Sequence, residues 1–335
     1  MALDVKVTIK LSGVAGSVGF GVPLILISKA SSNIEYAEYS DLDELPDAGF
    51  AETSTAYKLF QIMKMQNNKP VSIAVAQTTK KAAEALADYK GKARQVITVL
   101  GESGDSTMKQ VADYVETTDS MTYFPVVATA AAMADFEGLD RTMVGVHSDD
   151  TQALAAGMVG ATAGMAAGSF TYKNIIVKGV APDDVSDGDV KTIDNEDKSG
   201  VAYGYTLQRK AGDIVTTEGK AASGEFMDIV DSFDWIIQNI GYRGQKALNS
   251  EPKLPYDNRG IGMLEAATNS VLKDADNMGI IAHDEADVPV YETNFGTRAE
   301  VSPADRADRA YKLGCFSFEL AGAIHTGAIN GTVTA

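Results

Sequence analysis

Apolar runs and amphipathic stretches alternate along the first part of the chain. Short runs rich in Val, Ile and Leu predict strands, at residues 22–28, 71–76, 95–100, 123–129, 142–147 and 174–180. Stretches with helical spacing or helix-forming composition lie between most of them, at residues 53–66, 78–89, 106–116 and 150–167. Such alternation is typical of a mainly parallel or mixed sheet covered by helices. We therefore predict an α/β lobe over residues 22–200.

The pattern changes towards the middle of the chain. Residues 182–200 are acidic, rich in turn-forming residues and without helical period, which predicts a surface connection. Residues 201–207 and 213–217 flank Lys210-Ala-Gly-Asp213 and predict a hairpin. The architecture thus turns from alternating to antiparallel.

Helices dominate the pattern that follows the hairpin. Residues 224–240 give the strongest periodic signal, with apolar side chains at i+3 and i+4 spacing. A second helix is predicted from Asp257 or Asn258 to Met278, and a third begins at Ser302-Pro-Ala-Asp305 with a capping serine. We place a second, α+β domain at residues 201–335.

Both chain ends carry apolar residues in patterns typical of strands. Near the N-terminus four apolar residues alternate with polar ones and share one face, namely Val5, Val7, Ile9 and Leu11. The segment 323–335 is rich in β-branched residues and includes Ile324, Ile329 and Val333. A segment that leaves the chain free to bend follows the first strand and contains Gly13, Gly16, Gly19 and Gly21. We therefore treat residues 1–21 as a strand arm with a glycine hinge, and expect both terminal strands to complete the sheets of neighbouring subunits.

Composition narrows the classes of function. The chain has 46 acidic and 29 basic residues and a net charge of −17, which disfavours binding to nucleic acid or to an anionic membrane. A single cysteine excludes an intrachain disulfide, and the three histidines are scattered without metal-ligand spacing. The glycines of residues 13–21 precede a strand-like run rather than a helix, so they do not fit a phosphate-binding loop. We expect no cofactor, no metal and no catalytic residue.

An uncharged stretch at residues 151–170 has the length of a membrane span but consists mostly of alanine and glycine. We expect a tightly packed helix here and no membrane insertion. Gly160, Gly164 and Gly168 recur every fourth residue and would let another backbone approach, within the subunit or across an interface.

Acidic residues recur every third position around the strongest helix, at Glu225, Asp228, Asp231 and Asp234. Paired carboxylates can serve acid–base chemistry in a closed cleft, but on a helix they favour an exposed ridge. Such a ridge could meet a basic patch of a neighbour, and two sets of candidates are Arg243, Lys246 and Arg259, or Arg298, Arg306 and Arg309. Trp235 is expected to be a packing or interface anchor.

Several segments together resemble contractile tail sheath proteins of bacteriophages and of phage-tail-like bacteriocins. They include Gly224-Glu-Phe-Met-Asp-Ile-Val-Asp-Ser-Phe-Asp-Trp235 and Leu254-Pro-Tyr-Asp-Asn-Arg-Gly-Ile-Gly-Met-Leu-Glu265, with residues 168–179, 304–309 and 320–333. The resemblance implies a structural subunit, not an enzyme, with an inner domain completed by terminal strands of neighbouring subunits. Residues 22–200 would form the outer lobe.

The resemblance also implies partners and a location. Copies of the chain would polymerise helically, in stacked six-fold rings, around a tail tube protein, with baseplate and tail terminator proteins at the ends. The particle would be a virion tail or a phage-tail-like particle assembled in the cytoplasm of a bacterial host. Two alternatives stay open: an α/β enzyme that binds a nucleotide or sugar, and another self-assembling protein such as a tail tube or surface-layer subunit.

Overall fold

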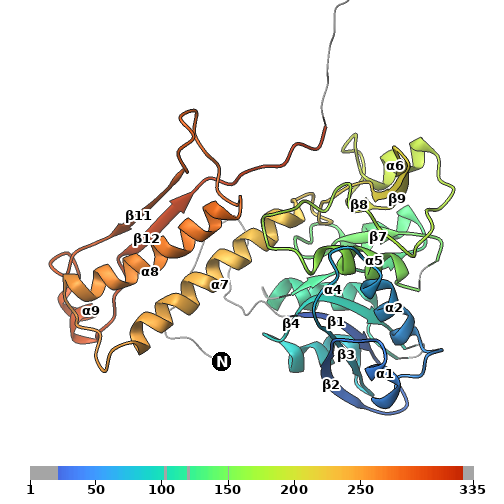
Figure 1. The fold of residues 1–335 in the computed structure, drawn as a ribbon, viewed down its shortest axis with the longest axis horizontal. Coiled ribbons are helices and arrows are strands. Elements are labelled where there is room, and N and C mark those ends of the chain that lie inside the picture. Colours follow the sequence, from blue (N-terminus) through green and yellow to red (C-terminus); the bar gives the residue numbers. More distant parts are fainter. Residues whose placement is uncertain (1–21, 102–103, 119–120, 150, 327–335) are drawn as a thin grey trace, which may run out of the picture.

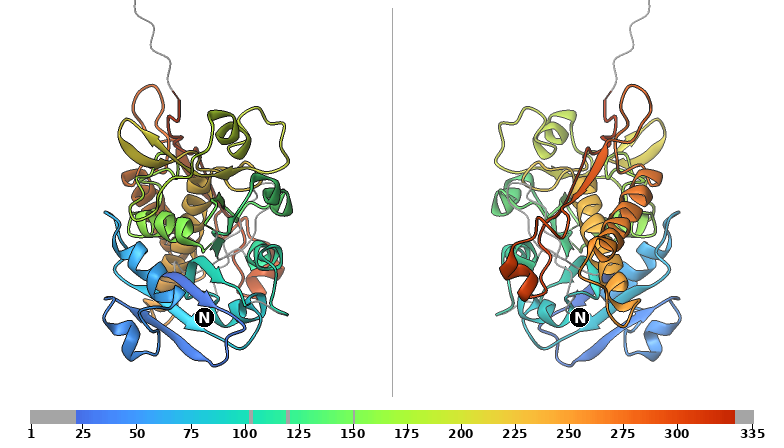
Figure 2. Two further views of the ribbon diagram at one scale, coloured as in Figure 1. Left: turned by 90° about the vertical axis from the view of Figure 1, so that its right-hand side faces the viewer. Right: turned by 90° about the vertical axis from the view of Figure 1, so that its left-hand side faces the viewer.

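The computed structural model describes residues 22–101, 104–118, 121–149 and 151–326 (Figure 1). Within these residues an α/β lobe lies beside a layer of two long helices and a two-stranded ribbon (Figures 1 and 2). One of the helices, α7 (Met227–Asn249), runs from the lobe into the layer. The arrangement therefore joins the two parts through a continuous helix.

A five-stranded sheet forms the centre of the lobe, in the order β2-β3-β1-β4-β5. Four of its strands run parallel to one another, namely β1 (Val22–Ile27), β3 (Ile73–Gln77), β4 (Ala93–Val99) and β5 (Thr122–Tyr123). β2 (Ile34–Tyr39) pairs antiparallel at one edge. The predicted α/β lobe with a mixed sheet is confirmed, although the sequence pattern did not indicate β2.

Alternate side chains of the central strands pack against helices on opposite faces of this sheet. Ile25 and Val75 face a core shared with α1 (Glu44–Asp47), α2 (Thr55–Lys64) and α5 (Ala153–Thr162). Leu24 and Leu26 face a second core shared with α3 (Ala82–Ala85), the 3-10 helix η1 (Leu86–Tyr89) and α4 (Met108–Thr118). Because both faces are covered, β1 and β3 are apolar along almost their whole length.

A second, smaller sheet extends the lobe. It contains the parallel strands β6 (Val126–Val127), β7 (Val144–Val146) and β8 (Gly204–Tyr205), with the 3-10 helix η2 (Ala130–Phe136) between the first two. The predicted hairpin is present as β9 (Leu207–Lys210) and β10 (Asp213–Thr216). Its two turn residues, Ala211 and Gly212, have φ of 51° and 96°, as a tight hairpin turn of this twist requires.

Two predictions about the lobe are wrong. Within residues 182–200 the structure contains a helix, α6 (Asp187–Ile193), which starts with a reciprocal capping box between Ser186 and Asp189. At seven residues it is too short to show a helical period. Residues 174–180 form no regular strand, since only Ile176 bridges to Val215 of β10.

The predicted helix over residues 150–167 ends at Thr162, so that Gly160 lies in α5 and Gly164 lies beyond its end, and both serve close packing inside the subunit. A Cβ atom on Gly160 would lie 2.5 Å from Cα of Met63 in α2, and one on Gly164 would lie 2.2 Å from the carbonyl oxygen of Asn68. The two backbones can approach only because glycine has no side chain.

Among the described helices, none has both the length and the apolar character that crossing a bilayer requires.

The helical layer consists of α7 and α8 (Asn258–Asn277). The bounds of α8 are close to those predicted, whereas α7 continues to Asn249, well past the predicted end at residue 240. A hydrogen-bonded pair of antiparallel strands, β11 (Tyr291–Phe295) and β12 (Gly314–Phe318), lies against them, and α9 (Pro303–Ala307) falls between these strands. We call β11 and β12 the β-ribbon. Ile236, Ile240 and Leu272 form the centre of this core, which Phe316 and Phe318 of the β-ribbon help to cover.

Helix α7 contributes to a hydrophobic core of the lobe with its first turns and to the core of the helical layer with its later turns. Met227 and Val230 belong to the core of the lobe, whereas Ile236 and Ile240 belong to that of the layer. β8 pairs with β7 of the lobe, and Leu207 of β9 also lies in the core of the lobe. The division between the cores thus comes later in the chain than the predicted boundary after residue 200.

Candidate assembly surfaces

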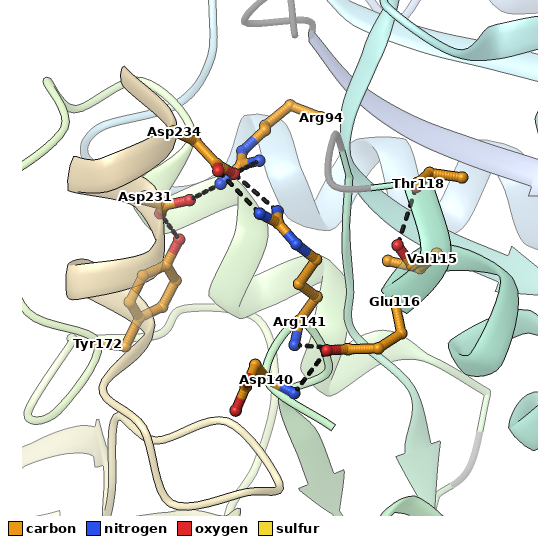
Figure 3. Close-up of polar contacts among 9 residues, drawn as sticks. All are labelled: Arg94, Val115, Glu116, Thr118, Asp140, Arg141, Tyr172, Asp231 and Asp234. Carbon is orange, nitrogen blue, oxygen red and sulfur yellow. Dashed lines mark hydrogen bonds and ion pairs between the residues drawn. The ribbon is translucent and has the colours of Figure 1, made fainter. Parts of the chain in front are cut away.

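Two of the four acidic residues predicted to form an exposed ridge on α7 are buried. Asp234 is 7% exposed and receives hydrogen bonds from Arg141, whose Nη1 and Nη2 lie 2.7 and 2.8 Å from its carboxylate oxygens. Arg94 of β4 contacts both Asp231 and Asp234, and the Tyr172 hydroxyl donates to Asp231 at 2.6 Å (Figure 3). We call these five residues the α7 clamp.

The clamp overturns the assignment of Asp231 to an exposed partner-binding ridge. The first turns of α7 are inserted into the lobe, so that Asp231 and Asp234 face the arginines of their own subunit (Figure 3). Of the basic residues proposed as partners on a neighbour, Arg243 pairs with Asp274 of α8 in its own subunit. The contacts of the clamp join residues that lie 59 to 140 positions apart in the chain, so sequence reasoning did not find it.

Electrostatic compensation makes the clamp stable despite its burial. Burial by itself would raise the pKa of Asp234, but Arg94 and Arg141 outweigh it and hold the pKa below its ordinary value. Burial, reinforced by the neighbouring Asp231, raises the pKa of Tyr172 well above its ordinary value, so Tyr172 remains a hydrogen-bond donor. Glu116 accepts from the backbone N–H of Arg141 at 3.0 Å and fixes its main chain (Figure 3). The clamp thus carries two positive and two negative charges with specific geometry.

The other predicted residues, Glu225 just before α7 and Asp228 and Trp235 within it, have different surroundings. Glu225 is half-buried and its Oε1 accepts from the backbone N–H of Phe226 at 3.0 Å. The pKa of Asp228 is raised to about 6, mainly by burial and further by Asp231 and Glu225. Its Oδ1 has no hydrogen-bond partner among the described residues. Trp235 is partly buried against the core of the helical layer, as the packing alternative predicted.

The β-ribbon has two faces of opposite character. Tyr291, Phe316 and Phe318 are directed towards α7 and α8, whereas Glu292 and Ser317 are exposed on the other face. Within the described part of the chain, β11 and β12 pair only with each other as strands. Antiparallel strands direct alternate backbone groups to either side, so each outer edge of the ribbon offers unpaired N–H and C=O groups. The β-ribbon is therefore a template for an additional strand.

The lobe protects its own sheet edge in a way that the ribbon does not. Edge strand β2 carries the exposed carboxylates of Glu35 and Glu38, which disfavour pairing with another strand. β12, in contrast, has no charged residue between Gly314 and Phe318. Strand addition is therefore favoured at the β12 edge of the ribbon, because β11 carries the exposed Glu292.

Most predicted residues of the terminal arms lie outside the described residues. These are Val5, Val7, Ile9, Leu11, Ile329 and Val333, together with the hinge residues Gly13, Gly16, Gly19 and Gly21. Ile324 is described and is 92% exposed, so its side chain is available to a partner.

No protein-family model matches the sequence, and a search of curated proteins finds no match. Solved structures do match, over nearly the whole chain. The sheath complex of an extracellular contractile injection system, PVC, in its contracted state aligns with a TM-score of 0.70 and 10% identity, covering 99% of this chain and 98% of the other. The fold is that of contractile tail sheath proteins.

Two further structures support this sheath fold. A chain of the six-fold symmetrised baseplate of the anti-feeding prophage aligns over 100% of both chains, with a TM-score of 0.69 and 13% identity. The sheath tail protein Lin1278 of Listeria innocua aligns over 92% of this chain and 97% of its own, with a TM-score of 0.55 and 8% identity. The α/β sheath fold predicted from the resemblance is thereby confirmed.

Proposed function

We propose that this chain is a structural subunit of a contractile tail sheath. It polymerises helically around a tail tube and, on contraction, drives the tube through a cell envelope. The observation that carries the proposal is the match to a contracted sheath over 99% of this chain, lobe and helical layer included. The fold alone does not dictate function, and the open β-ribbon supplies the second argument because polymerisation by strand addition requires such an edge.

In this proposal the terminal arms connect subunits through the β-ribbon. The N-terminal arm, with Val5, Val7, Ile9 and Leu11 on one face, pairs with the ribbon of a neighbour, and the C-terminal segment joins the same inter-subunit sheet. The glycines of residues 13–21 act as the hinge. The helical layer provides the inner domain around the tube, while the lobe, which includes β8 to β10, faces outward. Glu225, Asp228 and Trp235 remain candidates for contacts to partners.

Energy for contraction is stored in the extended lattice. Each 100 Å² of additional apolar surface buried per subunit contributes about 2.5 kcal/mol, which becomes large when many subunits contract together. This mechanism needs no cofactor and no catalytic residue. The partners are further copies of the chain in stacked six-fold rings, the tail tube protein, and baseplate and tail terminator proteins. Assembly takes place in the cytoplasm of a bacterial host, and the product is a virion tail or a phage-tail-like particle.

Electron microscopy of the purified, concentrated chain tests the proposal. We expect long tubes of sheath-like diameter. Replacing the apolar face of the arm (Val5, Val7, Ile9 and Leu11 to Ser) should abolish tubes and leave a folded monomer. The matched control replaces its polar face (Lys6, Thr8 and Lys10 to Ser) and should retain tubes. Thin tubes or flat lattices would instead indicate a tube or surface-layer subunit, and monodisperse particles at every concentration would refute self-assembly.

Cross-linking locates the arm on the β-ribbon. Cys315, the only cysteine, is exposed on the outer face of β12. If the apolar face of the arm packs inward beside Phe316, its polar face shares the side of Cys315. Thr8→Cys should then form an inter-subunit disulfide with Cys315, and Val7→Cys should not. To test the β11 edge, Thr8→Cys is combined with Asn294→Cys in a Cys315→Ser background, and the same inter-subunit disulfide is looked for. Failure of the polar-face cysteines at both edges would refute strand addition at the ribbon.

A second candidate is a sheath-like subunit of the baseplate. It is favoured by the alignment over 100% of both chains to a chain from a baseplate structure. Such a subunit would form a single ring, so closed discs that never elongate into tubes would indicate this role.

A further inference from the structure

The chain leaves the helical layer after β12 and returns to the lobe. The N–H of Ala321 donates to the carbonyl oxygen of Ile280 at 2.9 Å, which is the last backbone hydrogen bond of this segment among the described residues. Four residues later, His325 lies against the lobe. Figure 1 shows the segment crossing from the β-ribbon towards the start of α7.

A pocket in the lobe holds the imidazole of His325. Its Nε2 lies 2.8 Å from Oγ1 of Thr171, within hydrogen-bond distance. Its ring meets that of Phe226 edge to face, with centroids 5.0 Å apart and planes at 84°. Its Nδ1 is 3.9 Å from Oε1 of Glu218. We call Thr171, Glu218 and Phe226 the His325 pocket.

The pocket contains its own electrostatic and packing contacts. Glu218 is 6% exposed, and the ammonium groups of Lys173 and Lys220 each lie 3.7 Å from its Oε2. The backbone N–H of Gly219 donates to Oε1 of Glu218 at 2.9 Å. Lys220 also lies over the ring of Phe226, 5.2 Å from its centroid. The pocket is therefore built from lobe residues and does not depend on His325 to neutralise its carboxylate.

The residues just before His325 extend into solvent. Ala321, Gly322, Ala323 and Ile324 are all exposed, whereas the side chain of His325 is 15% exposed. The segment thus holds to the lobe through one side chain. One hydrogen bond and one edge-to-face ring contact contribute only a small free energy of attachment. The attached and released states of the segment are therefore both accessible.

We propose that His325 is a releasable latch that fixes, on its own subunit, the point from which the C-terminal arm departs. When the latch is closed, the arm leaves from the lobe beside the start of α7. When it is open, the arm leaves from the end of the β-ribbon at Ala321. The four residues 322–325 then add up to about 13 Å of reach. The latch itself is a property of the free subunit; its use in assembly rests on the proposed sheath function, where arms must stay connected while subunits move.

Distance measurement between spin labels on the free subunit tests the latch. One label is placed at Thr326→Cys and the other at the exposed Glu196→Cys, in a Cys315→Ser background. We expect a narrow distance distribution that broadens in His325→Ala and partly broadens in Thr171→Val. Ala323→Ser, which changes an exposed residue outside the pocket, is the matched control and should stay narrow.

The outcomes separate the latch from the rest of the proposal. Each variant must unfold with the midpoint of the parent chain, as followed by Trp235 fluorescence, so that broadening reports release and not loss of the fold. A broad distribution in the parent chain, or a distribution unchanged by His325→Ala, would overturn the latch and leave tube formation untouched. Conversely, a chain that forms no tubes could still show the narrow distribution of a closed latch.

Discussion

The α7 clamp predicts that one buried carboxylate contributes far more to stability than an exposed one of equal charge. We consider Asp234→Asn, which keeps the shape of the side chain and removes its charge. Asp234 accepts two hydrogen bonds from Arg141 and also contacts Arg94, and these two arginines are 1% and 3% exposed. The substitution removes a carboxylate that both buried guanidinium groups contact, whereas Asp231 keeps its contact to Arg94.

The expected cost follows from the burial of the groups left behind. Removing one partner of a buried ion pair destabilises a protein by about 3–5 kcal/mol, because a charge stays in the interior without compensation. Total stabilities of domains are about 5–15 kcal/mol, so this loss is a large part of the whole. We expect Asp234→Asn to lower the free energy of unfolding by about 3–5 kcal/mol at pH 7, where the carboxylate of the parent chain is ionised because its pKa is lowered.

Urea unfolding measures this cost. Trp235 is the only tryptophan and lies next to Asp234 on α7, so its fluorescence reports the helix, and far-UV circular dichroism serves as the second probe. The protein concentration is kept where dilution does not move the midpoint, so that assembly does not contribute. Asp113→Asn is the matched control, because Asp113 forms an exposed i,i+4 pair with Lys109 at 2.7 Å. The control should cost no more than about 0.5 kcal/mol.

A double-mutant cycle tests whether the ion pair itself is responsible. In an Arg141→Met background, Asp234→Asn should cost less than it does in the parent chain, because one of the two guanidinium groups that pair with Asp234 is already absent. The reasoning is refuted if Asp234→Asn costs within about 1 kcal/mol of Asp113→Asn, or if the two substitutions simply add.

Other predictions concern single groups whose surroundings are equally defined. His283, whose pKa is raised by hydrogen bonds to two aspartates, should titrate above about 6.5 by NMR; its contacts stabilise at low pH and are lost as pH rises through its pKa. His325, whose pKa is lowered by burial, should titrate below this value, and its docking should weaken as pH falls. A midpoint on the other side of about 6.5 would contradict the assignment of the histidine concerned. Asp228→Asn should stabilise the chain at pH 7 by about 1–2 kcal/mol in urea unfolding. The reason is that the Asp228 carboxyl has a pKa of about 6 in the folded chain, so that its ionisation lowers the stability as pH rises from about 4 to 6. A destabilised variant would show instead that the charge of Asp228 is compensated. Gly160→Ala should destabilise by about 1–3 kcal/mol through the clash with α2, whereas Gly262→Ala, with open space around its Cβ, should gain about 0.5–1 kcal/mol; equal effects would refute the close approach.

Local patterns predicted those parts of the fold that local physics determines. The hairpin at Ala211-Gly212 follows from turn chemistry, and α7 and α8 follow from long apolar stripes. The ribbon strand β11 and the edge strand β2 were missed because they are covered on one side only and carry many polar residues. Short, half-exposed strands depend on their pairing partners more than on their own composition.

The clamp escaped prediction for a different reason. Its arginines and aspartates come together only through the tertiary fold, and the acidic residues were read as one ridge at a spacing of three. A finer signal was present: Asp234 follows Val230 by four positions and Met227 by seven, which places it on the buried stripe of α7. A carboxylate on an apolar stripe requires a buried cation. Arg94, at the start of the apolar strand β4, is such a cation.

The course of α7 restricts how a subunit with this fold can move. Its first turns are held in the lobe by Met227, Val230 and the clamp, and its later turns form the core of the helical layer. Bending between the two parts would have to break either a continuous helix or a buried ion cluster, and each costs several kcal/mol. Lobe and layer should therefore move as one body. In the proposed sheath, rearrangement between subunits then falls on the links between them: the arms, the ribbon edge that receives a strand, and the latch at His325 that sets the reach of the C-terminal arm.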